Sequence, residues 1–295
     1  MDSTIYQKKT PLFAFLTPAF LFMGVFLYYP FFMNIYNSFC NIEGLGTAAS
    51  GMNAPWYLNY AKLFQDPLMA TAVKNTLLLM LLTIVFQVGI ALALALLVDS
   101  IGAGTQFFRT VYFFPIVISA TALGLLFNLI FLYDGGMVNQ LLLKFGAAEP
   151  VDWKDEAHFF FTMSAPVMWQ YVGFYFVIIA TGLNNISPEL YEAAEIDGAG
   201  RWQRVRYLSL PLLHNVLCTC LILAITGALK IFDLPWVMMG DGMPLNQSWL
   251  TGTYMYNQTF TSGDVDYGST VAIVIVVLGV VISQAANAVF KEKDY

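Results

Sequence analysis

Long apolar stretches divide this sequence, and they restrict the chain to folds that a lipid bilayer can hold. One of them, "TLLLMLLTIVFQVGIALALALLV" at 76–98, contains no charged residue. A helix that crosses a membrane needs about 20 consecutive, mostly apolar residues. Six windows meet this requirement, and the sequence therefore predicts an all-α membrane protein with six transmembrane helices, at about 11–36, 72–98, 107–132, 158–183, 208–231 and 268–290.

The composition favours a single membrane domain. Hydrophobic residues make up 58% of the chain and charged residues only 11%, whereas soluble domains are about 45–50% apolar and about 25% charged. The net charge of −6 leaves no basic surface for nucleic acid. The cysteines follow no metal-binding or redox spacing, and we interpret Cys218 and Cys220 as small core residues.

Lysine and arginine in the connecting segments predict the orientation of the spans. With residues 1–10 in the cytoplasm, the cytoplasmic side has the larger basic count, with Lys8, Lys9, Arg109, Arg201, Arg204, Arg206, Lys291 and Lys293. The tail 291–295 is then cytoplasmic as well, and 37–70 is an extracytoplasmic loop. The first span lacks a small-residue cleavage site, so we expect a retained signal anchor.

The segment 187–206, "SPELYEAAEIDGAGRWQRVR", predicts a short helix between the fourth and fifth spans. Ser187 suits the N-cap and Pro188 the first helical position, while Gly198 suits the left-handed residue that ends a helix. The helix over 188–197 could lie on the lipid surface or dock onto a protein. Its acidic first half and its Ala193-Ala194 pair favour docking over anionic lipid.

The stretch "EAAEIDGAGRWQRVRYLSLPLL" resembles the signature loop of permease subunits of bacterial ABC importers, the binding-protein-dependent transport system inner membrane components. The matching residues are Glu192, Ala193, Ala194, Gly198, Leu210 and Pro211, and "IDGA" at 196–199 is typical of the carbohydrate branch. The resemblance implies the type I ABC importer permease fold. It also implies that the loop is a coupling helix seated in a separate ATPase, with coupling residues Tyr191, Glu192, Ala193, Ala194, Asp197 and Gly198.

Further segments resemble the same family across most of 71–290, the expected permease core. They are "YDGGMVNQLL" at 133–142, "GDGMP" at 240–244, and "YMYNQTF" before the last span. The resemblance implies a multi-pass protein of the bacterial inner membrane, surrounded by lipid. Its implied partners are a second permease chain, an ATPase dimer that carries ATP and Mg²⁺, and an extracytoplasmic sugar-binding protein.

The chain lacks the sequence features of an enzyme. A phosphate-binding P-loop ends in Gly-Lys, and no Gly-Lys pair occurs in the sequence. We therefore expect a transport subunit without cofactor, metal or nucleotide of its own. His158 and His214 are too isolated to predict a metal site. An ion-coupled secondary transporter is the alternative from another class, but such proteins carry ionisable residues deep in their spans, and these span centres are almost free of charge.

A sugar pathway needs aromatic surfaces and hydrogen-bonding side chains. The fourth span offers both in "MWQYVGFYF" at 168–176. Family resemblance implies that the spans on either side of the coupling loop line the cavity, although span aromatics often serve packing alone. The predicted pathway residues are Asn128, Gln170, Tyr171, Phe174, Gly227 and Ile231. An oligosaccharide is the expected substrate. A glycerol-phosphate-type solute is the alternative, but it would want basic cavity residues, and only Lys230 is near.

Overall fold

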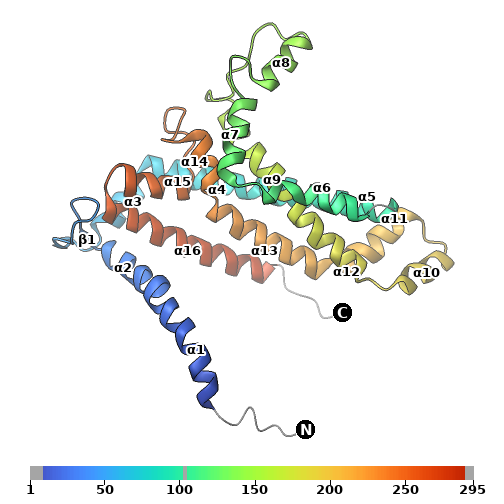
Figure 1. Ribbon diagram of the computed structural model, residues 1–295, viewed down its shortest axis with the longest axis horizontal. Helices are drawn as coiled ribbons and strands as arrows, with labels where there is room; N and C mark the ends of the chain where they lie inside the picture. Colours follow the sequence, from blue (N-terminus) through green and yellow to red (C-terminus); the bar gives the residue numbers. More distant parts are fainter. Residues whose placement is uncertain (1–8, 102–104, 290–295) are drawn as a thin grey trace. The chain divides into compact units, whose positions relative to one another are not determined.

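The computed structural model describes residues 9–101 and 105–289, and side chains from residue 12 onward. Figure 1 shows the helices and strands of the chain with their labels. The chain divides into two compact units. Unit 1 combines Met1–Asp66 with Met255–Val274, and unit 2 combines Pro67–Tyr254 with Ile275–Tyr295.

Helices of membrane-spanning length lie where the apolar windows fall. Among the described residues, four uninterrupted helical runs are long and apolar enough to cross a bilayer, namely Leu12–Asn37, Pro67–Ile101, Phe159–Asn184 and Val265–Val289. Two further pairs of helices meet the requirement together, which gives up to six spans. The structure therefore agrees with an all-α membrane fold.

The two paired spans are bent, which the sequence did not predict. The window 107–132 contains α6 (Thr105–Val117) and α7 (Ala120–Ile130), which meet at 92°. A new helix, α7, begins after Ser119. The Ser119 side chain caps this helix by accepting a hydrogen bond, 3.2 Å long, from the backbone N–H of Ala122. The window 208–231 likewise covers the end of the run Arg201–Leu212 and α13 (His214–Lys230), and the run and α13 meet at 67°. Pro211 lacks the N–H that would bond one turn back, which favours a kink there.

Unit 1 joins the N-terminal helix to the start of the last one. Helices α1 (Lys9–Met23) and α2 (Tyr29–Asn37) run on through the π-helical turn η2 (Gly24–Tyr28). A two-stranded antiparallel sheet, β1 (Cys40–Asn41) with β2 (Gly51–Met52), and α3 (Leu58–Gln65) follow. The other elements of the region are α15 (Thr251–Tyr256), η5 (Asn257–Thr261) and α16 (Val265–Val289), and the first and last of these also reach into unit 2.

Polar contacts, one of them buried, hold unit 1 together. The buried amide of Asn59 donates 3.1 Å to a carboxylate oxygen of Asp266 at the start of α16. Lys62 of α3 pairs with Asp264 at 2.7 Å and lies over the ring of Tyr267. The buried Asn59–Asp266 bond fixes α3 to the first turn of α16, because a buried polar group needs a partner, and the Lys62–Asp264 pair adds an exposed contact just before that turn.

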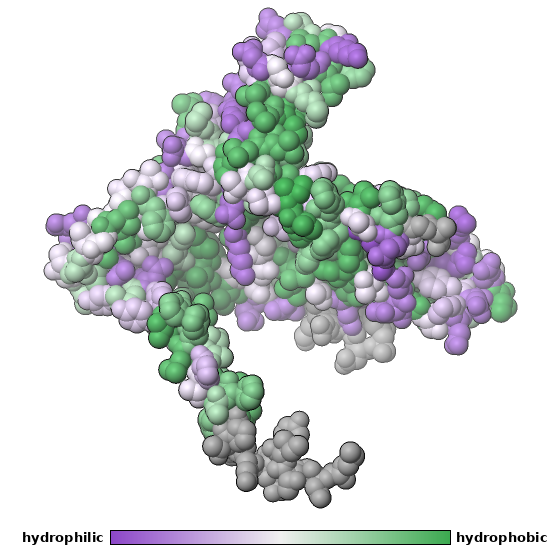
Figure 2. Space-filling view, viewed as in Figure 1, coloured by the Kyte–Doolittle hydropathy of each residue, from purple (hydrophilic) through white to green (hydrophobic). Residues whose placement is uncertain are grey.

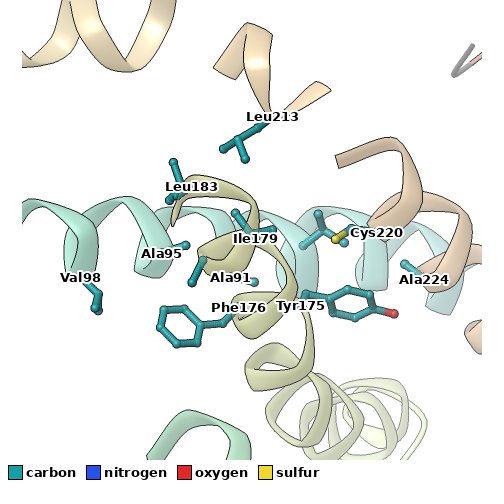
Figure 3. Close-up of a cluster of buried hydrophobic side chains, with 12 residues drawn as sticks. Ala91, Ala95, Val98, Tyr175, Phe176, Ile179, Leu183, Leu213, Cys220 and Ala224 are labelled. Atoms are coloured by element: carbon teal, nitrogen blue, oxygen red, sulfur yellow. The ribbon is translucent and has the colours of Figure 1, made fainter. Parts of the chain in front are cut away.

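Unit 2 is built around α9 (Phe159–Asn184). A continuous run of α4 (Pro67–Leu82), η3 (Thr83–Val88) and α5 (Gly89–Ile101) packs against it. Figure 3 shows Phe176, Ile179 and Leu183 of α9 close to Ala91 and Ala95 of α5, with Cys220 of α13 in the same cluster. A second cluster joins α4, α7, α9 and α14 (Asp233–Met239). Cys218 and Cys220 are both buried, as predicted for core residues.

Asn139 organises the segment between α7 and α9. It lies on α8 (Met137–Lys144) and is 1% exposed. Its amide nitrogen donates to the carbonyls of Leu132, Tyr133 and Val151 at 2.9–3.2 Å. Its oxygen accepts from the backbone of Val151 and from the indole of Trp153. One side chain thus ties both ends of the segment to α8.

Replacing Asn139 by aspartate should therefore unfold this segment. The carboxylate keeps the shape of the amide but loses its donors and faces three carbonyl oxygens. A buried polar group left without its partner costs about 1–3 kcal/mol, and a charged one more. We expect N139D to lower the melting temperature of the purified chain by several degrees. Gln140→Glu adds the same charge at the next position, which is exposed, and it should leave the melting temperature unchanged. Equal stability of the two variants would contradict the prediction.

Candidate functional site

The short helix α10 (Pro188–Ile196) lies between α9 and α11 (Arg201–Arg204), in the segment where the sequence predicts a helix over 188–197. Ser187 occupies the N-cap, as predicted, but its side chain makes no capping bond, and Pro188 takes the first helical position. Glu189 lies in the first turn, near the positive end of the helix dipole.

Gly198 ends α10 in the way that its sequence position predicts. Its φ is +78°, in the left-handed region that favours glycine. The N–H of Gly198 donates to the carbonyl of Glu195 at 3.0 Å, and the N–H of Ala199 donates to that of Ala194 at 2.9 Å. This pair of bonds is the Schellman arrangement, which satisfies the last carbonyls of the helix and turns the chain sharply.

Two side-chain contacts hold α10 against the elements that follow it. The hydroxyls of Tyr191 and Ser209 lie 3.0 Å apart, and Ser209 is buried in the π-helical turn η4 (Val205–Ser209). The guanidinium of Arg204 lies 3.2 Å from a carboxylate oxygen of Glu195. From η4 the chain continues through α12 (Leu210–Leu212) into α13. The contacts make α10, α11 and η4 one connected structure.

The predicted coupling residues lie on α10 or in the two positions that follow it. Four of them are exposed on the surface, namely Glu192, Ala193, Asp197 and Gly198, while Tyr191 and Ala194 are half-buried. A groove of about 350 Å³ between α10 and α11 has Ala194, Asp197 and Gly198 in its lining. The exposed face of α10 is acidic and contains small residues at its centre, so another protein's backbone could approach it closely.

A cavity of about 330 Å³ lies inside unit 2. Residues of η3, α9 and α13 line it, together with the segment that connects α13 to α14. Aromatic rings contribute through Tyr171, Phe174 and Tyr175 of α9, and hydroxyl or amide groups contribute through other lining residues, namely Thr83, Gln87, Gln170 and Thr226. The cavity therefore combines apolar faces with hydrogen-bonding groups, the combination that binds hydroxyl-rich solutes.

Two buried glutamines shape the cavity wall. Gln87 donates 2.8 Å to the carbonyl of Val167, and Gln170 donates 3.2 Å to the carbonyl of Ile118. Ile118 lies at the break between α6 and α7, so its carbonyl has lost its helical partner and Gln170 supplies one. These bonds fix the wall because each amide spans two helices.

The structure brings together most of the predicted pathway residues. Gln170, Tyr171, Phe174, Gly227 and Ile231 all line the cavity. Asn128 does not. Its amide nitrogen donates 3.1 Å to the carbonyl of Val237 on α14, so the prediction that Asn128 faces the cavity is not supported by its position.

Several lining residues are absent from the list of predicted pathway residues. Gln87 is the main polar group in the charge-free span 76–98, and this signal could have identified it. Lys230 and Asp233 also line the cavity and are exposed. They flank the point where α13 ends, and their opposite charges give the cavity edge no net charge. Tyr175 lies one helical turn after Tyr171 and could have been included by that spacing.

The isolated histidines have local partners. The carboxylate of Asp155 lies 2.7 Å from the Nδ1 of His158. Desolvation acts to raise the pKa of Asp155, but hydrogen bonds from His158 and Ala157 outweigh it and hold that pKa below the usual value. His214 contacts the thiol of Cys218 at 3.5 Å. Within residues 9–101 and 105–289, no cluster of three or more His, Cys, Asp or Glu could hold a metal ion.

Comparisons with known proteins agree with this arrangement. The family model described as "binding-protein-dependent transport system inner membrane component" matches residues 102–293. The chain is 31% identical to the probable ABC transporter permease protein YurN of Bacillus subtilis, over 97% of this chain and 98% of that protein. It is 30% identical to the lactose transport system permease protein LacF of Rhizobium radiobacter, over 91% of this chain and 90% of that protein.

A solved structure has the same fold. It is the bacterial ABC transporter involved in the import of the acidic polysaccharide alginate, with a TM-score of 0.84 at 23% identity over 96% of each chain. The transporter has also been solved with an alginate pentasaccharide-bound periplasmic protein, and that match has a TM-score of 0.82. Family model, full-length relatives and fold agree: this multi-pass membrane chain belongs to the binding-protein-dependent transport system inner membrane components, the permease subunits of ABC importers.

Proposed function

We propose that this chain forms half of the translocation pathway of an ATP-driven oligosaccharide importer. A second permease chain supplies the other half, an ATPase dimer binds ATP and Mg²⁺ and hydrolyses ATP, and an extracytoplasmic binding protein delivers the sugar. Both chain termini and α10 are then cytoplasmic. The names of the relatives support a sugar, because LacF transports lactose and the alginate importer transports a polysaccharide.

One observation carries the proposal. The helices on either side of α10 are the helices that line the cavity. α9 contributes Gln170, Tyr171 and Phe174 to it and runs into α10 after residues 185–187, while α13 contributes Gly227. A displacement of α10 can therefore act on both walls, directly through α9 and, through the Tyr191–Ser209 contact, on the run Arg201–Leu212 that leads into α13.

The coupling step follows from this connection. A groove in the ATPase subunit receives the acidic face of α10, and Glu192 pairs there with a basic side chain. A charge-assisted hydrogen bond of this kind contributes about 1.5–3 kcal/mol. When ATP closes the ATPase dimer, α10 moves with its groove, and α9 and α13 change the access of the cavity between the two sides of the membrane. Movement of packed helices as units is a common form of such transitions.

The cavity chemistry favours a sugar over a phosphate-bearing solute. Phosphate recognition needs a surplus of positive charge. Here Lys230 is accompanied by Asp233 in the same lining, so the cavity offers a phosphate no such surplus. Tyr171, Phe174 and Tyr175 instead offer ring faces to the apolar side of a sugar ring.

Reconstitution of the importer tests the proposal. The chain would be purified with its co-encoded subunits, and the subunits identified by mass. Uptake and ATP hydrolysis would be measured in vesicles with neutral oligosaccharides, acidic oligosaccharides and glycerol-phosphates. We expect a complex with one copy of this chain, one copy of a second permease chain and two copies of the ATPase. We also expect its ATP hydrolysis to be stimulated by an oligosaccharide together with its binding protein. Recovery of the chain alone, moving solute without ATP, would contradict the proposal.

Filling the cavity should block uptake without affecting folding. A Cβ added at Gly227 meets no atom within 4 Å, so Gly227→Leu would project into the cavity, and leucine is the better helix former. We expect sugar uptake in vesicles to fall by about tenfold or more, equivalent to about 1.4 kcal/mol, at normal abundance. Gly89→Leu is the matched control, because Gly89 also has open space around it and lies outside the cavity lining. Normal uptake by Gly227→Leu would exclude this cavity from the pathway.

A further inference from the structure

The helical run after α10 lies at a steep angle to its span. Arg201–Leu212 is bent by 67° from α13. Membrane-spanning helices are tilted by about 20° on average from the bilayer normal. The run therefore lies closer to the membrane plane than to the normal, the orientation of interfacial helices.

This run has two different faces. Gln203, Arg204, Tyr207 and Leu208 line the groove shared with α10. Arg201, Trp202 and Arg206 do not line it, and all three are exposed, Trp202 by 71%. Trp202 and Arg206 are four residues apart, the spacing that places side chains on one side of a helix. The indole and the guanidinium groups thus lie on a surface that α10 does not cover.

The charges on the two neighbouring elements are opposite. α10 and its C-cap carry Glu189, Glu192, Glu195 and Asp197, whereas Arg201–Leu212 carries three arginines and no acidic residue. Arg204 is paired with Glu195. Arg201 and Arg206 form no ion pair with any residue that the structure describes. Figure 2 shows mostly hydrophilic residues over this end of unit 2.

We infer that Arg201, Trp202 and Arg206 form a binding site for the headgroups of anionic phospholipids. Tryptophan is enriched at the membrane–water interface because its ring is apolar and its N–H is polar. Exposed arginines beside it are attracted to anionic lipid, while the acidic α10 is repelled from the same surface. The lipid then keeps the exposed face of the run Arg201–Leu212 at the membrane surface, while the acidic face of α10 stays available for docking. The inference requires a membrane-spanning chain, and it holds for any transported solute.

Quenching of Trp202 fluorescence tests the site. The full chain would be reconstituted into phosphatidylcholine vesicles containing either brominated phosphatidylglycerol or brominated phosphatidylcholine. The signal of Trp202 is the difference between the wild-type chain and Trp202→Phe. We expect stronger quenching of this signal by the brominated phosphatidylglycerol. A basic residue near an anionic surface contributes about 1 kcal/mol, so each of Arg201→Gln and Arg206→Gln should lower the preference for phosphatidylglycerol about fivefold.

Matched variants separate a headgroup site from a general effect of charge. Arg206→Lys keeps the charge and should retain most of the preference. Lys144→Gln removes one positive charge from the exposed end of α8 and should leave the preference unchanged. Equal quenching of Trp202 by the two brominated lipids would overturn the inference. So would quenching that disappears when the ATPase subunits are bound, because that result would place this face in a protein interface.

Discussion

Gly198→Val is expected to abolish sugar uptake by the assembled importer while the chain still reaches the membrane. The φ of +78° at Gly198 lies where a Cβ approaches the following carbonyl oxygen. An L-residue in this conformation costs about 1–2 kcal/mol, and a β-branched side chain is a worse case. The valine chain must avoid this conformation, so both hydrogen bonds that end α10 are lost.

The loss should affect coupling rather than folding. A Cβ at Gly198 has no atom within 4 Å, and the residue is exposed, so no core contact is disturbed. What changes is the path of the chain from α10 to α11, and with it the orientation of α10 relative to Arg204. We expect ATP hydrolysis that no longer responds to the sugar and its binding protein.

Two substitutions serve as controls for Gly198→Val. Asparagine adopts left-handed backbone more readily than most residues, so Gly198→Asn should retain much of the uptake. Gly200→Val places the same side chain two residues later, where φ is −67° and the nearest atom to a Cβ lies 3.5 Å away. It should transport almost normally. The coupling hypothesis is refuted if Gly198→Val transports at the wild-type rate and abundance.

Gly173→Ala is expected to have the largest effect on stability. A Cβ at Gly173 would lie 1.7 Å from the carbonyl oxygen of Tyr112 and 2.3 Å from its carbon. These are backbone atoms of α6 and cannot rotate away, so α9 and α6 would have to separate. Overpacking costs about 1–3 kcal/mol, occasionally more. Small residues allow such close approach of helices within membranes.

Membrane abundance and melting temperature measure this effect. Gly279→Ala is the matched control, because Gly279 lies in a long apolar helix and also faces another helix. The nearest atom to its Cβ is a methyl group of Leu229 at 3.8 Å, an ordinary contact. We expect Gly279→Ala to resemble the wild type and Gly173→Ala to be depleted. Similar abundance of both variants would show that the α6–α9 contact tolerates separation.

The sequence predicts those features that depend on local chemistry. α10 could be anticipated because Pro188 and Gly198 act on their own backbone, and the apolar windows give the spans because lipid imposes a minimum length. Hydropathy could not predict the bends at Ser119 and Leu213, because the apolar runs continue through both, although Pro211 precedes the second bend by two residues. The sequence also could not show that Gly173 is tightly packed and that Gly227 faces open space, because the space around each glycine depends on which helix lies opposite.

The cavity residues also divide into those that local sequence predicts and those that depend on packing between helices. Gln170, Tyr171 and Phe174 follow from one helix and its family resemblance. The placement of Asn128 depends on α14, whose Val237 carbonyl takes its amide. Gln87 stands out as a polar residue in its charge-free span, but its bond to α9 depends on how η3 packs on that helix.

The uneven burial of the spans implies an order of events during biogenesis. The window Leu12–Asn37 has 0% of its residues buried within the chain, whereas that of Phe159–Asn184 has 56%. The first helix can partition into the bilayer on its hydrophobicity alone as it leaves the ribosome. α9 carries Gln170, which is shielded by partners, and it packs on α13, which is synthesised later. The packing of α9 is therefore complete only after α13 has been synthesised, so the cavity that both helices line forms late.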